Sequence, residues 1–169
     1  AFLANSVVRP LRQATARLRA MSRDTAKLAP LPSERNDEIG ALIAGYNQLQ
    51  AALHKHEEEL RLAASVFDNA QEGILITDAQ ANIIQVNPSF SRLTGYSAAE
   101  VIGRNPRLLA SGKTPPETYR EMWSALKQGK AWHGELINLR KDRSEFVQME
   151  SIAPVLGSDN KVSHFIGVI

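Results

Sequence analysis

The stretch GILITDAQANIIQV (residues 73–86) joins two short apolar runs, residues 73–77 and 83–86, through a polar segment that contains Asp78 and Asn82. Short runs of β-branched and aliphatic residues are typical of strands, and Asp and Asn favour tight turns. The stretch therefore predicts a β-hairpin. Because the apolar period is helical up to Phe67, a strand-rich domain is expected to begin just after that residue.

Downstream of the hairpin, helix-like segments come first and strand-like segments follow. Tyr119, Met122 and Leu126 fall on one face of a helix, together with the neighbouring Trp123. This order predicts a five-stranded antiparallel sheet with helices on one face, in the α+β class. The predicted helices span residues 88–93, 98–102 and 115–128, and the remaining predicted strands span residues 132–140, 146–155 and 162–169.

Several short motifs in this order resemble a PAS domain. The resemblance covers about residues 62–169, and we place the domain at residues 68–169. It implies a sensory module whose sheet and helices enclose a pocket for a flavin, a haem or a small metabolite, or a module that only dimerises. The motifs are Asp78, VNPSF (86–90), LTGY (93–96), EVIG (100–103), WHGE (132–135) and RKD (140–142).

The residues narrow the choice of pocket ligand. Haem-binding members of the family use a histidine on the long helix, and residues 115–128 contain none, which argues against haem. The chain has no cysteine, so disulfides and photochemistry through a cysteinyl adduct are excluded. Pro106 stands where photosensory members carry the reactive cysteine. The four histidines are His54, His56, His133 and His164.

FAD stays open, because residues 114–156 resemble the FAD-binding PAS domains of nitrogen-fixation redox regulators. The resemblance implies that Trp132 packs beside the isoalloxazine and that Asn138 bonds its polar edge, with Asn87 and Asn105 as further candidate contacts. The same pattern resembles PAS domains of diguanylate cyclases and histidine kinases without a known cofactor. Trp132 and Asn138 are then a core aromatic and a strand-edge hydrogen bond. A pocket that holds an unidentified small molecule, or no ligand at all, is also compatible with these residues.

Upstream of the PAS-like region the apolar residues recur at alternating spacings of three and four. This is the heptad period of a helix that packs along a partner helix. The linker at residues 57–67 is therefore expected to be a coiled coil in a homodimer. The predicted seam consists of Ile39, Leu42, Tyr46, Leu49, Leu53, His56, Leu60, Ala63 and Phe67.

The segment before this linker resembles a HAMP domain, a relay of parallel helices that forms a four-helix bundle in the dimer. The resemblance rests on RPL (9–11), an extended connector at residues 29–36, and DEIG (37–40), with Asn36 or Asp37 as the helix cap. We place the domain at residues 9–56. The predicted signalling residues are Pro10, Glu38 and Gly40 from the resemblance, Leu49 and Leu53 on the seam, and His56, a polar seam residue that can set register.

Residues 1–35 carry seven basic and two acidic side chains, although the net charge of the whole chain is only +2. A basic segment behind the apolar residues 1–8 is typical of the cytoplasmic flank of a transmembrane helix. We therefore expect residues 1–8 to end such a helix, at the cytoplasmic side of a bacterial inner membrane. The first residue is Ala1, and the last residues lie within a predicted strand, so we also expect the natural protein to extend both ways. No aromatic residues alternate with the arginines, which argues against nucleic acid as a partner.

These expectations describe a non-enzymatic fragment of a sensor. The sequence has no phosphate-binding glycine loop, no metal-ligand spacing and no catalytic triad order. The predicted function is to relay a stimulus to a downstream effector, such as a histidine kinase of a two-component system or a cyclic-di-GMP enzyme. A redox- or oxygen-sensing FAD module is a second possible function, and a purely structural dimerisation scaffold is a third.

Overall fold

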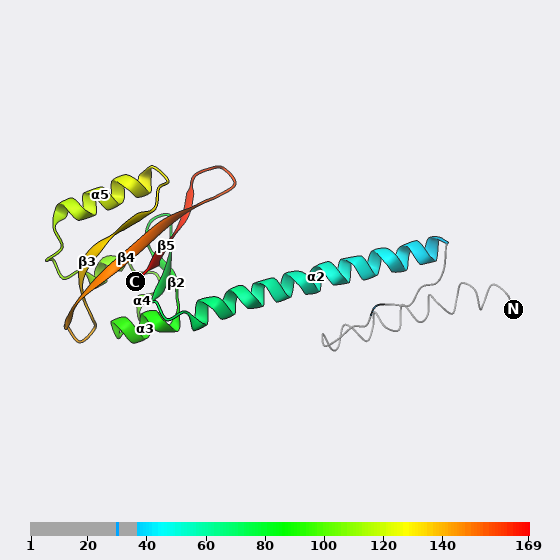
Figure 1. Ribbon diagram of the computed structural model, residues 1–169, viewed down its shortest axis with the longest axis horizontal. Helices are drawn as coiled ribbons and strands as arrows, with labels where there is room; N and C mark the ends of the chain where they lie inside the picture. Colours follow the sequence, from blue (N-terminus) through cyan, green and yellow to red (C-terminus); the bar gives the residue numbers. More distant parts are fainter. Residues whose placement is uncertain (1–29, 31–36) are drawn as a thin grey trace. The chain divides into compact units, whose positions relative to one another are not determined.

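The computed structural model describes Pro30 and residues 37–169, and Figure 1 traces the chain. The chain divides into two compact units, Ala1–Leu60 and Arg61–Ile169, and helix α2 (Glu38–Asn69) contributes to both. None of the described helices is long and apolar enough to cross a membrane. The predicted transmembrane end at residues 1–8, the first HAMP helix and Pro10 lie outside the described residues.

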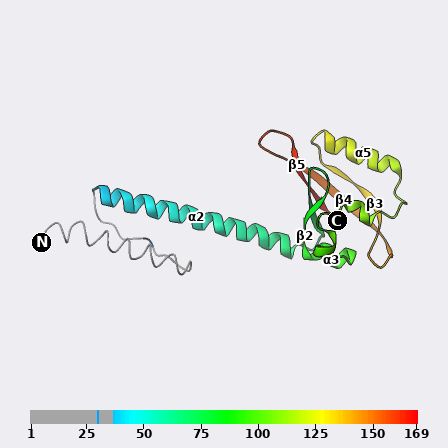
Figure 2. The same ribbon diagram turned by 180° about the vertical axis from the view of Figure 1, so that it is seen from behind.

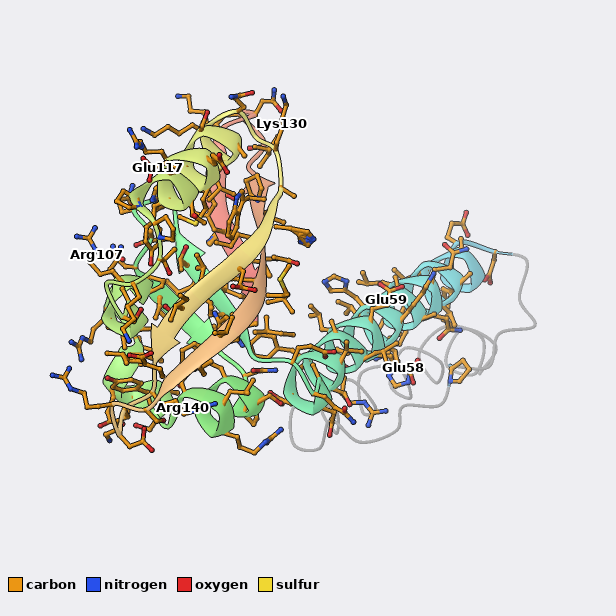
Figure 3. All side chains as sticks on the ribbon, turned by 60° about the vertical axis from the view of Figure 1, so that its left-hand side comes forward. Glu58, Glu59, Arg107, Glu117, Lys130 and Arg140 are labelled. Carbon is orange, nitrogen blue, oxygen red and sulfur yellow. The ribbon has the colours of Figure 1, made fainter. Side chains whose placement is uncertain are left out.

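Helix α2 runs without interruption through the predicted seam. Its start is capped, because the backbone N–H of Gly40 donates to Oδ1 of Asp37 at 3.0 Å. Within one chain the seam residues Leu49 and Leu53 are 61% and 56% exposed. Glu38 and His56 are exposed and Gly40 is buried, and the sticks of Figure 3 show Glu58 and Glu59 projecting from the helix. The helix thus carries a row of exposed apolar side chains.

The sheet has five strands in the order β2-β1-β5-β4-β3, and every neighbouring pair is antiparallel. This confirms the predicted sheet, and the strand ends differ from the predicted ends by a single residue or not at all. Side chains alternate between the two faces of each strand, and only one face carries the helices. The strands are β1 (Ile74–Asp78), β2 (Ile83–Val86), β3 (Trp132–Leu139), β4 (Glu145–Leu156) and β5 (Val162–Val168).

The turn between β1 and β2 forms for the predicted reason. Oδ1 of Asp78 accepts the backbone N–H groups of Gln80 and Asn82 at 2.9 and 2.8 Å, and Oδ2 accepts the side-chain amide of Asn82 at 2.9 Å. These bonds favour the carboxylate form, so the pKa of Asp78 lies below its ordinary value. Ala81 takes a left-handed conformation with φ of 61°.

Four helical segments separate β2 from β3. They are α3 (Pro88–Thr94), α4 (Ala98–Val101), η2 (Pro106–Leu109) and α5 (Pro116–Lys127). The sequence predicted three of them; η2, a 3-10 turn, was not predicted, because four residues show no periodicity. Helix α5 packs on β3 and β4, which Figures 1 and 2 show from opposite sides, while α3 and α4 contact β1 and β2. The hydrophobic core beneath α3, α4 and η2 consists of Leu75, Ile83, Phe90, Val101 and Leu109.

Candidate functional site

A cavity of about 400 Å³ lies between α5 and the helix-bearing face of the sheet. This volume is within the range of about 300–1,000 Å³ that is usual for small-molecule sites. Most of its wall is apolar and comes from four strands, η2 and α5. The apolar lining residues are Leu75, Ala81, Pro106, Leu109, Ala110, Met122, Trp123, Leu126, Leu136, Ile152 and Phe165.

Two aromatic side chains of the cavity wall lie close to each other. The ring of Trp123 on α5 meets the ring of Phe165 on β5 edge to face, with centroids 6.0 Å apart and an angle of 89° between the planes. This geometry is favourable for aromatic pairs. Trp123 is still 38% exposed, so a planar ligand can reach it. Sequence reasoning placed Trp123 on the apolar face of the helix and did not identify it as a site residue.

Asn138 is one of the polar lining residues, and it was predicted from sequence. It lies on β3 and is only 5% exposed. Its backbone pairs with Ala110 and with Phe146, but no described residue hydrogen-bonds its side-chain amide. Buried amides are normally satisfied. The amide of Asn138 is therefore available to a bound molecule.

Glu150 on β4 also lines the cavity and is 7% exposed. Its Oε2 accepts a hydrogen bond from Nε2 of Gln148 at 2.9 Å. Burial raises the pKa of Glu150 to about 7, because the charged form loses its hydration, and the bond from Gln148 opposes this only in part. Oε1 of Gln148 is buried and has no hydrogen-bond partner among the described residues.

Asn105 lines the cavity as well, but the protein already uses its side chain. Its Nδ2 donates to the carbonyl of Ala81 at 3.0 Å, and its Oδ1 accepts from N and Nε of Arg107 at 3.0 and 3.1 Å. It thereby caps η2 and ties this turn to the β1–β2 hairpin. Arg107 also belongs to the lining, and Figure 3 shows its side chain extending outward.

Asn87 was predicted as a ligand contact, and the structure places it at a joint outside the cavity lining. It is 1% exposed, and its Nδ2 donates to the carbonyls of Phe67 and Glu72 at 3.1 and 2.9 Å. Its Oδ1 accepts the backbone N–H groups of Ile74 and Phe90 at 2.8 and 2.9 Å. One side chain thus joins the end of α2 to β1 and caps α3.

Trp132, the other predicted cofactor contact, is half-buried on β3 and does not belong to the cavity lining. Its ring lies over Gly134, where an added Cβ would collide with the indole. The ring therefore covers the strand two residues along, on the face that also carries Leu136 and Asn138. The cofactor contacts predicted for Trp132, Asn138, Asn87 and Asn105 stay predictions.

The sequence carries a signal for Glu150 in the polarity of β4. In a half-buried strand the apolar residues normally face the interior. On β4 the apolar Val147 and Met149 are 60% and 65% exposed, whereas Gln148 and Glu150 face inward. Phe146 and Ile152 lie on the inner face of β4, and because side chains alternate, Gln148 and Glu150 lie on that face as well. The reversed polarity marks a place where the interior is polar.

No cluster of acidic, histidine or cysteine side chains that could hold a metal ion occurs within the described residues. The wall fits a planar organic ligand better, because it combines the aromatic pair with the free amide of Asn138. If FAD binds, Trp123 and Phe165 are placed to pack on its ring and Asn138 to bond its polar edge.

Two family models match the chain. The model described as HAMP domain matches residues 2–55, and the model described as PAS domain matches residues 71–169. The chain thus carries a HAMP domain followed by a PAS domain, as the sequence predicted. The HAMP match overlaps the predicted domain at residues 9–56.

Among similar proteins is a nitrogen fixation regulatory protein of Klebsiella oxytoca, 44% identical over 104 residues, which cover 62% of this chain and 21% of that protein. A blue-light-activated histidine kinase of Rhizobium johnstonii is 33% identical over 109 residues, covering 63% of this chain and 32% of the kinase. The chain thus spans a small part of the relatives it matches.

Among solved structures, the PAS domain of a protein from Colwellia psychrerythraea superposes with a TM-score of 0.59 at 29% identity. The match covers 64% of this chain and 92% of that domain.

Proposed function

The chain belongs to the PAS domain family and carries a HAMP domain ahead of its PAS domain, and we propose that it relays signals in a dimeric, membrane-anchored bacterial receptor. In this proposal the HAMP domain receives motion from a transmembrane helix, and α2 passes it to the PAS domain. The whole segment works at the cytoplasmic side of the inner membrane. The output is a downstream effector domain, a histidine kinase or a cyclic-di-GMP enzyme.

The observation that carries the proposal is the joint at Asn87. Its four hydrogen bonds tie the last turn of α2 to the first strand and the first helix of the PAS domain. Ser89 adds a fifth bond, from its Oγ to the carbonyl of Ala70 at 2.5 Å. Because these bonds converge on the side chains of Asn87 and Ser89, which are each 1% exposed, the end of α2 is held firmly to the PAS domain at this point. A displacement of the end of α2 therefore also displaces the first strand and first helix of the PAS domain, and the reverse.

A dimer is favoured by the exposed seam of α2. Leu49, Leu53 and Leu60 are 61%, 56% and 58% exposed in one chain. Apolar side chains at heptad spacing are stabilised when a second helix covers them. A packed bundle with two competing registers then responds in discrete steps to a small displacement.

Cysteine crosslinking in membranes that contain the full-length receptor tests the relay. The chain has no cysteine of its own, so single cysteines at Leu49 or Leu53 report on their own position. We expect both to crosslink between two copies, and their crosslinking yields to change when Ser89→Ala loosens the joint. The matched control is a cysteine at the exposed Ala51, off the seam, which should crosslink poorly in both backgrounds. Equal yields at all three positions would rule out the dimeric seam.

An FAD-binding redox or oxygen sensor is the second candidate. It is favoured by the aromatic pair and the free amide of Asn138 in a cavity of about 400 Å³. The visible absorbance spectrum of the purified chain, followed by mass spectrometry of the heat-released supernatant, decides it. A flavin spectrum with the mass of FAD would establish this candidate. A featureless spectrum without a released molecule would leave relay and dimerisation.

A further inference from the structure

Among the described residues, Glu150 is the one carboxylate that lines the cavity. Glu150 pairs across the strands with Gly134, and Gly167 lies on the neighbouring strand β5. A Cβ added at Gly167 would lie 3.4 Å from Oε1 of Glu150. The indole of Trp132 covers Gly134 and the side chain of Leu75 lies beside Gly167, so the carboxyl group is enclosed by apolar side chains where it does not face the cavity.

Glu150 offers the cavity a hydrogen-bond acceptor without a matching donor. Nε2 of Gln148 is already bonded to Oε2 of Glu150. Oε1 of Gln148 also lacks a partner among the described residues, but Gln148 does not line the cavity. Oε1 of Glu150 has no donor there either. A buried acceptor without a donor costs about 1–3 kcal/mol, so a ligand that supplies N–H groups is favoured here.

Glu150 forms no ion pair with a described residue, so a cationic group of a ligand can serve as its partner. Apart from Glu150, the groups of the lining that carry or can take a charge are Arg107 of η2 and Tyr119 of α5, and β1, β3 and β5 contribute none. The Nε of Arg107 is engaged with Asn105, and its side chain is exposed. No described cation pairs with Glu150. A buried carboxylate in such a place is stabilised by an opposite charge.

We propose that the cavity binds an apolar, aromatic molecule that ends in a protonated amine, and that the Glu150 carboxylate is the counter-ion of this amine. This goes beyond the proposed relay, which makes no use of the cavity, and it is an alternative to the FAD candidate. The aromatic body lies against Trp123 and Phe165, where stacking and apolar contact stabilise it. The ammonium group donates to Oε1 of Glu150 from inside the cavity that this residue lines.

Asn138 marks the opposite end of the ligand. Its partner across the strands, Phe146, is four residues from Glu150 on β4, which at the rise of a strand is roughly 13 Å. A ligand that reaches both groups therefore carries a polar group at its far end as well. A shorter ligand bonds Glu150 alone, so Glu150 is the obligatory contact and Asn138 sets the preferred length.

Binding is linked to a proton on Glu150. The pKa of this carboxyl group is raised to about 7 by burial, while an alkyl ammonium keeps its proton throughout the neutral range. The amine pairs with the ionised form. Lowering the pH below 7 therefore protonates Glu150 and weakens binding, and raising it strengthens binding until the carboxyl group is fully ionised.

The test uses 1-naphthylmethylamine and two matched molecules, 1-naphthalenemethanol and 1-naphthoic acid, in titration calorimetry on the purified chain. We expect the amine to bind roughly tenfold or more tightly than the alcohol, because an ion pair replaces a neutral hydrogen bond. The acid should bind least. The affinity of the amine should fall roughly 30-fold from about pH 8 to about pH 5.5, and that of the alcohol should not.

Glu150→Gln should remove the preference for the amine and its pH dependence while the alcohol binds as before. Glu135→Gln, a change of an exposed carboxylate on β3, is the matched control and should change neither. An unchanged preference in Glu150→Gln, equal binding of the three molecules, no binding of the amine, or flavin released from the purified chain would each overturn the proposal. The crosslinking test of the relay does not depend on any of these results.

Discussion

Asn87 and Asn138 are both buried asparagines, 1% and 5% exposed, and they lie in two regions of the PAS domain that use them in opposite ways. At the joint, Oδ1 and Nδ2 of Asn87 each take part in two hydrogen bonds. In the cavity, the amide of Asn138 has no partner among the described residues. The joint is therefore built for rigidity, whereas the cavity is left incomplete for a ligand.

The largest effect is expected from Asn87→Ala. It leaves two carbonyls and two backbone N–H groups without their partner in a buried place, and we expect a loss of about 3–5 kcal/mol in the free energy of unfolding. Denaturant unfolding followed by circular dichroism measures it. A loss below about 1 kcal/mol would mean that the joint is not the rigid element we describe.

The next largest effect is expected from Glu150, which makes the free energy of unfolding depend on pH. The folded state raises the pKa of Glu150 from its ordinary value of 4.5 to about 7, so it holds this proton more tightly than the unfolded chain. Its contribution is therefore most favourable below about pH 4.5 and is lost as the pH rises to about 7, by about 3 kcal/mol. Unfolding curves of the chain and of Glu150→Gln across this range should diverge, and parallel curves would contradict the burial of this charge.

A smaller effect is expected from Ser89→Ala, the second contact of the joint. The substitution removes the bond to the carbonyl of Ala70 and the bond that Ser89 Oγ accepts from Arg92. We expect a cost of about 1–2 kcal/mol without loss of the fold. Ser91→Ala, on the same helix, is the control. If Ser89→Ala left the amide exchange of residues 66–70 unchanged, Ser89 would not belong to the joint.

The smallest effect on stability is expected from a substitution of Asn138. This small effect is the clearest test of whether the cavity and the joint use their asparagines differently. Asn138→Ala removes an amide that bonds no described residue, so the free energy of unfolding should change by less than about 1 kcal/mol. The change falls on ligand affinity instead, and titration of a ligand with polar groups at both ends measures it. A loss as large as that of Asn87→Ala would show that Asn138 has a structural role and that the two regions do not differ.

Much of the fold could be predicted from local patterns. The runs at residues 73–77 and 83–86, with Asp78 and Asn82 between them, predicted a hairpin, because turn chemistry is a property of neighbouring residues. The heptad spacing likewise predicted the helix that became α2 (Glu38–Asn69). Segments without a local signature could not be predicted. One such segment is η2, which is held by the side chain of Asn105 and by Pro106. Its four residues are too few to show a period.

The candidate site was predicted only in part, for a related reason. Asn105 and Asn138 do line the cavity, whereas Trp132 folds over Gly134 and Asn87 serves the joint. An asparagine looks the same in sequence whether its amide is bonded or free. The partners of these amides come from elements up to 24 residues away, so their state is set only when the strands pair.

Residue type and short spacing were enough to set the order of helices and strands, the seam of α2 and the absence of cysteine chemistry, since each of these is a local property of the chain. The tertiary structure alone shows that Gln148 and Glu150 face inward on β4, while Val147 and Met149 face outward. The physical reason is register: a strand has two faces, and which one is covered depends on how β3, β4 and β5 pair and on where α5 lies against them.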